Sequence, residues 1–207
     1  MRIFKIFLTL IFLGIVSFAN DTNTTAQDQI VSKAPITFTL EDINSNTYHI
    51  TDTPTGLKIK ELEGKVVFLA FFGHRCPPCR MEIPGFIEFT KDKNYSSKAT
   101  ILAFEVQGLD ENTLKEFVKD VGINYNVISG SKYYDFISYI TQKTNWGNMI
   151  PFMVVLDQNG NIVNYGSGLV TPEELKYITD ELTKQQIISN AQENNNTKQN
   201  QTGEKHE

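Results

Sequence analysis

Residues 66–80 read VVFLAFFGHRCPPCR, an unbroken apolar run followed by two cysteines three positions apart. A short run of this kind predicts a central strand that is buried on both faces. Cys76 and Cys79 would then lie at the carboxyl end of the strand, and we expect a helix to follow them. Pro84 should kink this helix. The expected inner face of the helix consists of Met81, Phe86 and Phe89.

The segment before this run predicts an N-terminal β-hairpin. Apolar and polar side chains alternate over 36–40 and again over 48–50, a period of two that is typical of strands. Asn44, Ser45 and Asn46 are turn-forming residues between the two stretches. We expect residues 51–60, which include Pro54 and Gly56, to form a loop.

Strand and helix patterns alternate in the rest of the chain, which favours an α/β fold. Three further strands are expected, over 99–106, 152–156 and 161–165. Three further helices are expected, over 110–122, over 132–144 and from 171 onward. Asn159-Gly160 is typical of a tight turn between antiparallel strands, so the sheet should be mixed. Thr171 and Glu174 have the spacing of a capping box at the start of the last helix.

Both ends of the chain are expected to lie outside the folded domain. Residues 1–19 start basic, continue apolar and end in Ser17-Phe18-Ala19, which predicts a signal peptide cleaved after Ala19 and a periplasmic protein. An uncleaved membrane anchor is the alternative, although the apolar run is shorter than the roughly 20 residues of a bilayer span. We expect a polar linker over 20–33, the domain over 34–184 and a disordered polar tail over 185–207.

The two cysteines are the only ones among 207 residues. An exported chain meets oxidants, and a bridge between Cys76 and Cys79 would close too small a loop to add much stability. We therefore expect the pair to serve chemistry, with Cys76 attacking a substrate disulfide and Cys79 resolving the mixed disulfide. The net charge of −5 lacks the basic footprint of a nucleic-acid-binding protein.

Charges and donors near the cysteines bear on the direction of electron flow. A cysteine at a helix N-terminus faces free backbone N–H groups and the positive end of the helix dipole, which stabilise a thiolate. Pro77 and Pro78 supply no N–H, so they weaken this effect and favour a reductant. Arg75 and Arg80 add positive charge and act in the opposite direction. We expect the prolines to dominate.

Three other interpretations of the pair remain open. A structural zinc site needs about four ligands, and the available histidines are His49, His74 and His206. The pair could also form an inert bridge, or belong to a binding module that no longer catalyses. We expect no metal and no cofactor.

Residues 65–84 resemble the active-site segment of thioredoxin-fold proteins, most closely the TlpA/ResA-like branch with its Cys-Pro-Pro-Cys-Arg runs. The resemblance covers about 34–183 and includes Pro84, Ile150-Pro151 and the segments 157–163 and 169–175. It implies a thioredoxin fold, that is, a central mixed sheet flanked by helices, here with an N-terminal β-hairpin extension. It also implies thiol–disulfide exchange on protein substrates outside the cytoplasm, served by a membrane electron donor. In cytochrome c maturation members the substrate is often an apocytochrome c or a partner protein.

The resemblance also suggests roles for residues near the cysteines. Pro151 would be a cis-proline that binds substrate backbone, with Ile150 contacting the substrate; a trans proline that starts a strand is the alternative. Glu82 lies where ResA-like members carry an acidic residue that tunes the cysteines or assists proton transfer, and otherwise it is a solvated helix carboxylate.

Two positions depart from the family pattern. Arg75 replaces the usual Trp, and Ala70 replaces the buried Asp of thioredoxin, so Glu82 or Glu105 would have to substitute for that acid. Glu105 is otherwise a solvated charge at a strand end. His74 could titrate beside the dithiol, or it could be an exposed loop residue.

Two other redox functions fit the sequence less well. A DsbA-type oxidant carries a large helical insertion, and the about 70 residues between Cys79 and Ile150 leave no room for one. A peroxidase would need a Thr-flanked cysteine and a distant resolving cysteine. A non-enzymatic alternative is a binding module or chaperone for cytochrome c precursors.

Overall fold

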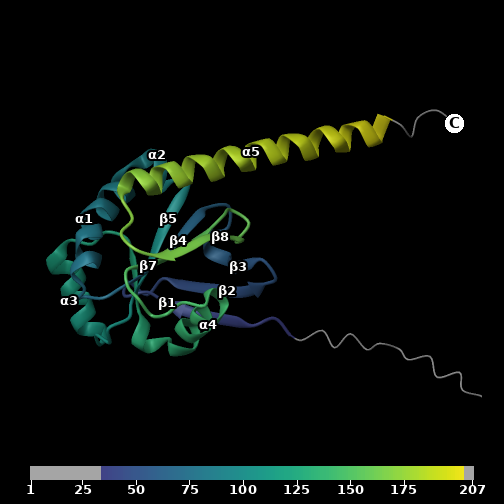
Figure 1. The fold of residues 1–207 in the computed structure, drawn as a ribbon. Coiled ribbons are helices and arrows are strands. Elements are labelled where there is room, and N and C mark those ends of the chain that lie inside the picture. The colour runs from purple at the N-terminus through teal and green to yellow at the C-terminus, as the bar shows by residue number, and fades with distance from the viewer. Residues whose placement is uncertain (1–33, 203–207) are drawn as a thin grey trace, which may run out of the picture. The chain divides into compact units, whose positions relative to one another are not determined.

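A computed structural model describes residues 34–202, so the predicted signal peptide, its cleavage site and the linker lie outside the described residues (Figure 1). The strands are β1 (Thr37–Glu41), β2 (Thr47–Thr53), β3 (Gly56–Ile59), β4 (Val66–Phe72), β5 (Ala99–Glu105), β6 (Asn126–Ser129), β7 (Phe152–Leu156) and β8 (Ile162–Ser167). The α-helices are α1 (Pro77–Lys91), α2 (Lys93–Ser96), α3 (Glu111–Val121), α4 (Tyr134–Thr144) and α5 (Pro172–Thr202). Two 3₁₀ turns are η1 (Lys60–Leu62) and η2 (Gly130–Lys132).

The central sheet has the strand order β6-β5-β4-β7-β8 and is mixed, as predicted. β5 runs parallel to both β4 and β6, whereas β7 runs antiparallel to β4 and β8. All seven residues of β4 are buried, which agrees with the prediction of a central strand. The sheet is therefore centred on the strand that leads into the cysteines.

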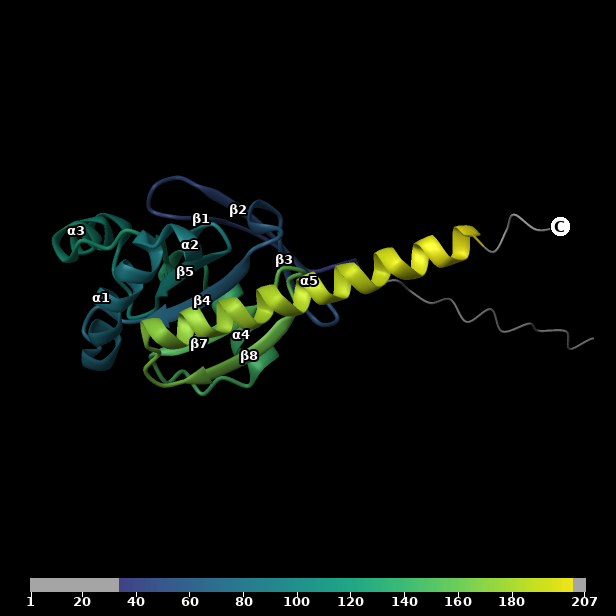
Figure 2. The same cartoon turned by 90° about the horizontal axis from the view of Figure 1, so that it is seen from above.

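Helices and a second sheet cover the two faces of the central sheet (Figures 1 and 2). On one face, Phe68 of β4 packs in a cluster with apolar residues of α1, α3 and α5. On the other face, Phe71 packs in a cluster with residues of α4 and of the small sheet β1-β2-β3. The alternate residues of β4 thus supply two separate hydrophobic cores.

The N-terminal sheet has three strands, so the prediction of a loop over 51–60 was wrong. β2 continues to Thr53, the turn falls at Pro54, and β3 then pairs antiparallel with β2. Leu57 and Ile59 are buried with the period of two that marks a strand. Pro54 and Gly56 belong to a hairpin turn and its exit, not to a longer loop.

Two short elements, α2 and β6, were missed, and one side chain was misplaced. β6 is a four-residue edge strand, too short to show a periodic pattern. Met81 is 70% exposed, so its prediction on the inner face of α1 was wrong. Ile83 takes that place, because it shares the buried side of α1 with Cys79 and Phe86.

The last helix begins as predicted and continues farther than predicted. Thr171 N donates a hydrogen bond to Glu174 Oε2 over 2.7 Å, and Glu174 N donates to Thr171 Oγ1 over 3.2 Å, which completes the capping box. α5 then runs to Thr202, through residues that we expected to be disordered (Figure 2). Their polar composition opposes burial, but a solvated helix needs only residues that tolerate helical backbone, and 173–202 contain no Pro or Gly.

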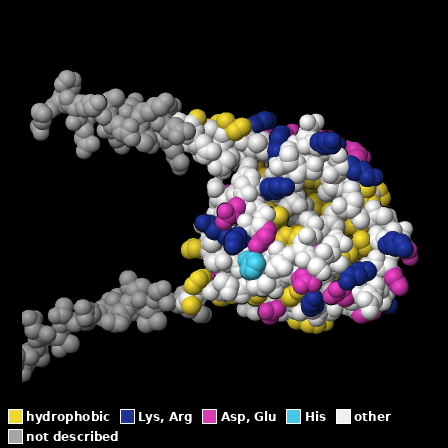
Figure 3. All heavy atoms as spheres, turned by 180° about the vertical axis from the view of Figure 1, so that it is seen from behind, with side chains coloured by type: hydrophobic (Ala, Val, Ile, Leu, Met, Phe, Trp, Pro, Cys, Tyr) yellow, Lys and Arg dark blue, Asp and Glu magenta, His cyan; other side chains and the backbone are white. Residues whose placement is uncertain are grey.

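Positive and negative side chains are mixed on the face of the described part that Figure 3 shows. Lys, Arg, Asp and Glu side chains are interspersed over the face that Figure 3 shows, rather than separated into large areas of one sign. Among residues 34–202, no helix has both the length and the apolar character that a membrane span requires.

Candidate active site

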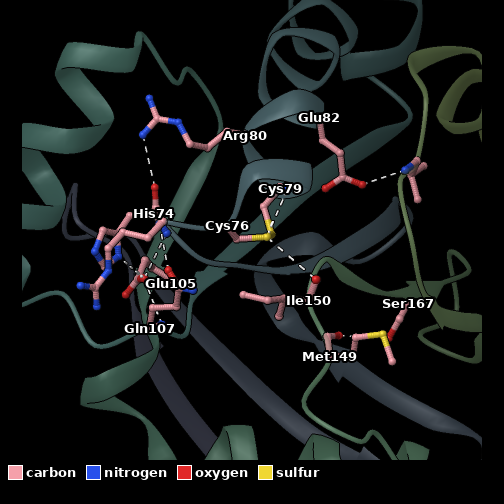
Figure 4. The surroundings of a disulfide bond; sticks show 12 residues. His74, Cys76, Cys79, Arg80, Glu82, Glu105, Gln107, Met149, Ile150 and Ser167 are labelled. Carbon is pink, nitrogen blue, oxygen red and sulfur yellow. Dashed lines mark hydrogen bonds and ion pairs between the residues drawn. A yellow bond between two sulfur atoms is a disulfide. The ribbon is translucent and has the colours of Figure 1, made fainter.

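The two cysteines join the end of β4 to the start of α1. Cys76 is the N-cap residue of α1, and its Sγ accepts a hydrogen bond from the backbone N–H of Cys79 over 3.2 Å. Pro77 and Pro78 occupy the first two helical positions, where a missing N–H leaves no helical hydrogen bond unmade. Cys76 and Cys79 are joined by a disulfide with an S–S distance of 2.04 Å (Figure 4).

The loop that precedes β7 lies beside the disulfide. The carbonyl oxygen of Ile150 is 3.9 Å from Cys76 Sγ (Figure 4). The Ile150–Pro151 peptide bond is cis, as the resemblance implied. β7 pairs with β4, which explains why residues distant in sequence meet here. Residue Cys76 is 6% exposed and residue Cys79 is 1% exposed, so both are buried in the disulfide form and Cys76 is the slightly more exposed of the two.

Trp146 and Ser167 anchor the same loop from its far side. Trp146 Nε1 and Ser167 Oγ both donate to the carbonyl oxygen of Met149, over 2.9 and 3.0 Å. The Trp146 ring stacks on Phe152 of β7 with 4.7 Å between ring centroids. Sequence reasoning missed this anchor, although Trp146 is the only tryptophan in the chain and lies close to Pro151.

Glu82 is a buried carboxyl group one helical turn after Cys79. It is 7% exposed, and its Oε1 accepts a hydrogen bond from Val170 N over 2.7 Å (Figure 4). Burial raises the pKa of Glu82 to about 7, and the Val170 N–H offsets part of that rise. Glu82 is thus not the solvated carboxylate of the alternative interpretation, and it can exchange a proton near neutral pH.

Glu105, which is buried, and His74, which is half-buried, form a pair on the other side of the cysteines in Figure 4. Glu105 ends β5, opposite Phe72 of β4, and is fully buried. Its Oε1 lies 2.9 Å from His74 Nδ1. Glu105 is therefore not a solvated charge at a strand end, and His74 is not an exposed loop residue.

The two arginines near the disulfide have different surroundings. Arg75 is exposed, and its backbone N–H donates to Gln107 Oε1 over 2.9 Å. Arg80 donates from Nη1 to the carbonyl oxygen of His74 over 3.3 Å, and its guanidinium carbon lies 5.6 Å from the centroid of the Phe117 ring. Gln107 had no recognisable signal in the sequence, because its role depends on a contact between two loops.

Of the two histidines within residues 34–202, only His74 lies near the cysteines, and its Nδ1 contacts Glu105. His49 binds Glu61 on the N-terminal sheet, with 2.6 Å between Nδ1 and Oε1, and His206 lies outside the described residues. Within residues 34–202, no three or more His, Cys, Asp or Glu side chains are placed to hold a metal ion.

A Cys-X-X-Cys disulfide at a helix N-terminus, beside a cis-proline loop, defines a thiol–disulfide oxidoreductase. The sequence model of the AhpC/TSA family matches residues 30–165, and the chain belongs to this family. The ResA thiol-disulfide oxidoreductase of Halalkalibacterium halodurans is 24% identical over 138 residues, which are 67% of this chain and 69% of that protein. A ResA of Bacillus cereus is 27% identical over 187 residues, 87% of this chain and 96% of that protein.

A solved structure confirms the fold. The thiol:disulfide interchange protein of the thioredoxin family from Chlorobium tepidum TLS matches with a TM-score of 0.58 and 22% identity. The match covers 70% of this chain and 92% of that protein. The predicted thioredoxin fold and the predicted similarity to ResA-like proteins are thereby confirmed.

The raised pKa of Glu82 gives a testable pH dependence of stability. The folded chain keeps a proton on Glu82 that the unfolded chain releases between pH 4.5 and about 7, so the free energy of unfolding should fall as pH rises through this range. Glu82→Gln keeps the oxygen that accepts from Val170 and removes the titration. The stability of oxidised Glu82→Gln relative to wild type should therefore rise by about 3 kcal/mol from pH 4.5 to 7, measured by urea unfolding.

The control for this measurement is Glu88→Gln, which changes a carboxylate on the same helix whose side chain is 66% exposed. Its free energy of unfolding should depend on pH in the same way as that of wild type. A constant stability difference between Glu82→Gln and wild type over the whole range would contradict the assignment.

Proposed function

We propose that the chain is an exported reductant of protein disulfides, in which Cys76 attacks and Cys79 resolves. The position of Cys76 carries this proposal. Cys76 Sγ lies at the first turn of α1, accepts from the Cys79 N–H over 3.2 Å and faces the loop before β7. A thiolate at this position is stabilised by the helix N-terminus, whereas Cys79 lies within the first turn and the residue is 1% exposed.

The reaction starts from the reduced dithiol. The Cys76 thiolate attacks one sulfur of a substrate disulfide, the substrate S–S bond breaks, and the departing substrate thiolate takes up a proton. Cys79 loses its proton and attacks Cys76 Sγ, which releases the second substrate thiol and leaves the Cys76–Cys79 disulfide. Two electrons pass to the substrate, and a membrane electron donor must return two electrons before the next cycle.

Glu82 is proposed to accept the proton that leaves Cys79. It is one helical turn from Cys79, it is buried, and its pKa of about 7 allows it to take up and release a proton at neutral pH. Ile150 and Pro151 are proposed to contact the substrate backbone, because their loop lies against Cys76 Sγ. Arg75, which is exposed next to Cys76, is proposed to contact the substrate as well.

We infer the direction of electron flow from the hydrogen-bond donors around Cys76. Pro77 and Pro78 supply no N–H, and the Arg80 N–H binds the carbonyl oxygen of Cys76 over 3.1 Å instead of the sulfur. The Arg80 guanidinium is held by the His74 carbonyl. The Cys76 thiolate is thus supported by few donors, so the reduced form is weakly stabilised and a reductant is favoured over an oxidant.

The location and pathway are proposed on the sequence features and on the resemblance. A signal peptide over 1–19 and a polar linker over 20–33 would deliver the domain over 34–184 to the periplasm. ResA-like resemblance favours an apocytochrome c or a partner protein of cytochrome c maturation as the substrate. A dithiol oxidant and a non-catalytic binding module are the alternatives that the following experiments separate.

Cys79→Ser should trap the substrate, because the mixed disulfide on Cys76 can no longer be resolved. Affinity purification under non-reducing conditions, followed by mass spectrometry, should identify a partner released by reductant. Cys76→Ser is the matched control, since it keeps one thiol in the pair and should trap nothing. Partners that bind both variants without a covalent link would favour the binding module.

The reduction potential should be closer to that of thioredoxin, about −270 mV, than to that of DsbA, about −120 mV. Equilibration with glutathione buffers, followed by alkylation of free thiols, measures it. Replacing Pro78 with Ala restores the backbone N–H of the second helical position, from which an N-cap side chain can accept, and should make the potential less negative. A wild-type value near that of DsbA would contradict the reductant and favour the oxidant.

A further inference from the structure

Glu105 is a carboxylate without exposed surface that the proposed reaction does not use. Burial of a charge is costly unless hydrogen bonds compensate it. Five N–H groups surround this carboxylate. The backbone N–H groups of Gln107, Gly108 and Leu109 donate over 3.0, 3.1 and 3.0 Å. His74 contributes its Nδ1 at 2.9 Å and its backbone N at 3.5 Å.

The loop that contains Gln107, Gly108 and Leu109 contacts the residues that precede Cys76. Gln107 Oε1 accepts from the backbone N–H of Arg75 over 2.9 Å. The Gln107 side chain also packs on Gly73, where an added Cβ would lie 2.2 Å from Gln107 Cδ. A side chain at position 73 would therefore displace the Gln107 side chain from its present place.

His74 is the residue that links Glu105 to the cysteine segment. Because a carboxylate only accepts hydrogen bonds, the hydrogen between the two groups belongs to His74 Nδ1. The His74 ring is 18% exposed and meets Phe117 edge-on at 6.4 Å. The His74 carbonyl oxygen accepts from Arg80, so the residue is held from both sides (Figure 4).

All three residues between β4 and the attacking sulfur are thus fixed by side chains from other parts of the fold. Cys76 is tied to this segment as well, because its backbone N–H donates a hydrogen bond to the Gly73 carbonyl oxygen over 3.1 Å. We propose that Glu105 is a positioning residue of thiol–disulfide exchange, which acts through His74 to hold Cys76 at the N-cap of α1. This inference rests on the proposed attack by Cys76.

The position of Cys76 matters because its sulfur lies 3.2 Å from the Cys79 N–H and 3.9 Å from the Ile150 carbonyl. A shift of the segment would weaken the helix N-terminal support of the thiolate and misalign it with a substrate disulfide. Misplacement of a reacting atom by about 1 Å can lower a rate by as much as about a hundredfold. Loss of one contact should cost less, and we expect about a tenfold effect.

His74→Leu and His74→Asn form a matched pair of variants. Leu removes the donor to Glu105, whereas the amide nitrogen of Asn can occupy the position of Nδ1 and restore it. Neither variant can carry a positive charge, so the pair separates the hydrogen bond from any effect of ring charge. The measurement is the rate at which reduced protein reacts with a model aromatic disulfide, at a temperature where urea unfolding shows every variant to be folded.

His74→Leu should react about tenfold more slowly than wild type, and His74→Asn should recover most of the rate. Glu105→Gln should slow the reaction as well, and the double variant Glu105→Gln with His74→Leu should be little slower than the slower single variant. If Glu105→Gln does not fold, the two His74 variants decide. Glu88→Gln, at an exposed carboxylate on α1, is the control and should react as wild type does.

Two outcomes would overturn the inference. One is a folded His74→Leu that reacts at the wild-type rate, and the other is a His74→Asn as slow as His74→Leu. Failure of the proposed function gives a different result, because wild type itself would then not react through Cys76 with the disulfide.

Discussion

The contact between the Cys79 N–H and Cys76 Sγ depends on one junction, where the buried strand β4 ends and α1 begins. Every residue of β4 is buried, and the strand pairs with β5 on one side and β7 on the other. The residues around the disulfide come from the ends of β5 and β7. β5 ends in Glu105 and its loop, and β7 is preceded by Ile150 and Pro151. The chemistry of the pair is therefore a consequence of where three adjacent strands begin and end.

Two buried carboxyl groups flank the disulfide, and their hydrogen bonds give them different roles. Glu82 accepts from a single backbone N–H, so burial raises its pKa and it can exchange a proton. Glu105 accepts from five N–H groups of two loops, which suits a group that holds structure in place. Residue type alone does not separate these roles; the number of donors does.

Local sequence patterns predicted those elements whose structure depends on residues that are close together in the sequence. The apolar run of β4 and the capping box at Thr171 belong to this class, because each needs only neighbours in sequence. β6 was missed because four residues show no period, and the third strand of the N-terminal sheet was obscured by the turn at Pro54. The His74–Glu105 and Arg75–Gln107 contacts join residues more than thirty positions apart, so no local pattern could predict them.

The N-terminus of α1 should make the two cysteines unequal in reactivity. Alkylation of the reduced protein with substoichiometric iodoacetamide at neutral pH, followed by peptide mass spectrometry, measures this difference. Cys76 should be modified first and Cys79 should remain largely free, because the helix N-terminus stabilises the Cys76 thiolate and Cys76 is the more exposed residue of the two. Equal modification of both sulfurs, or faster modification of Cys79, would contradict it.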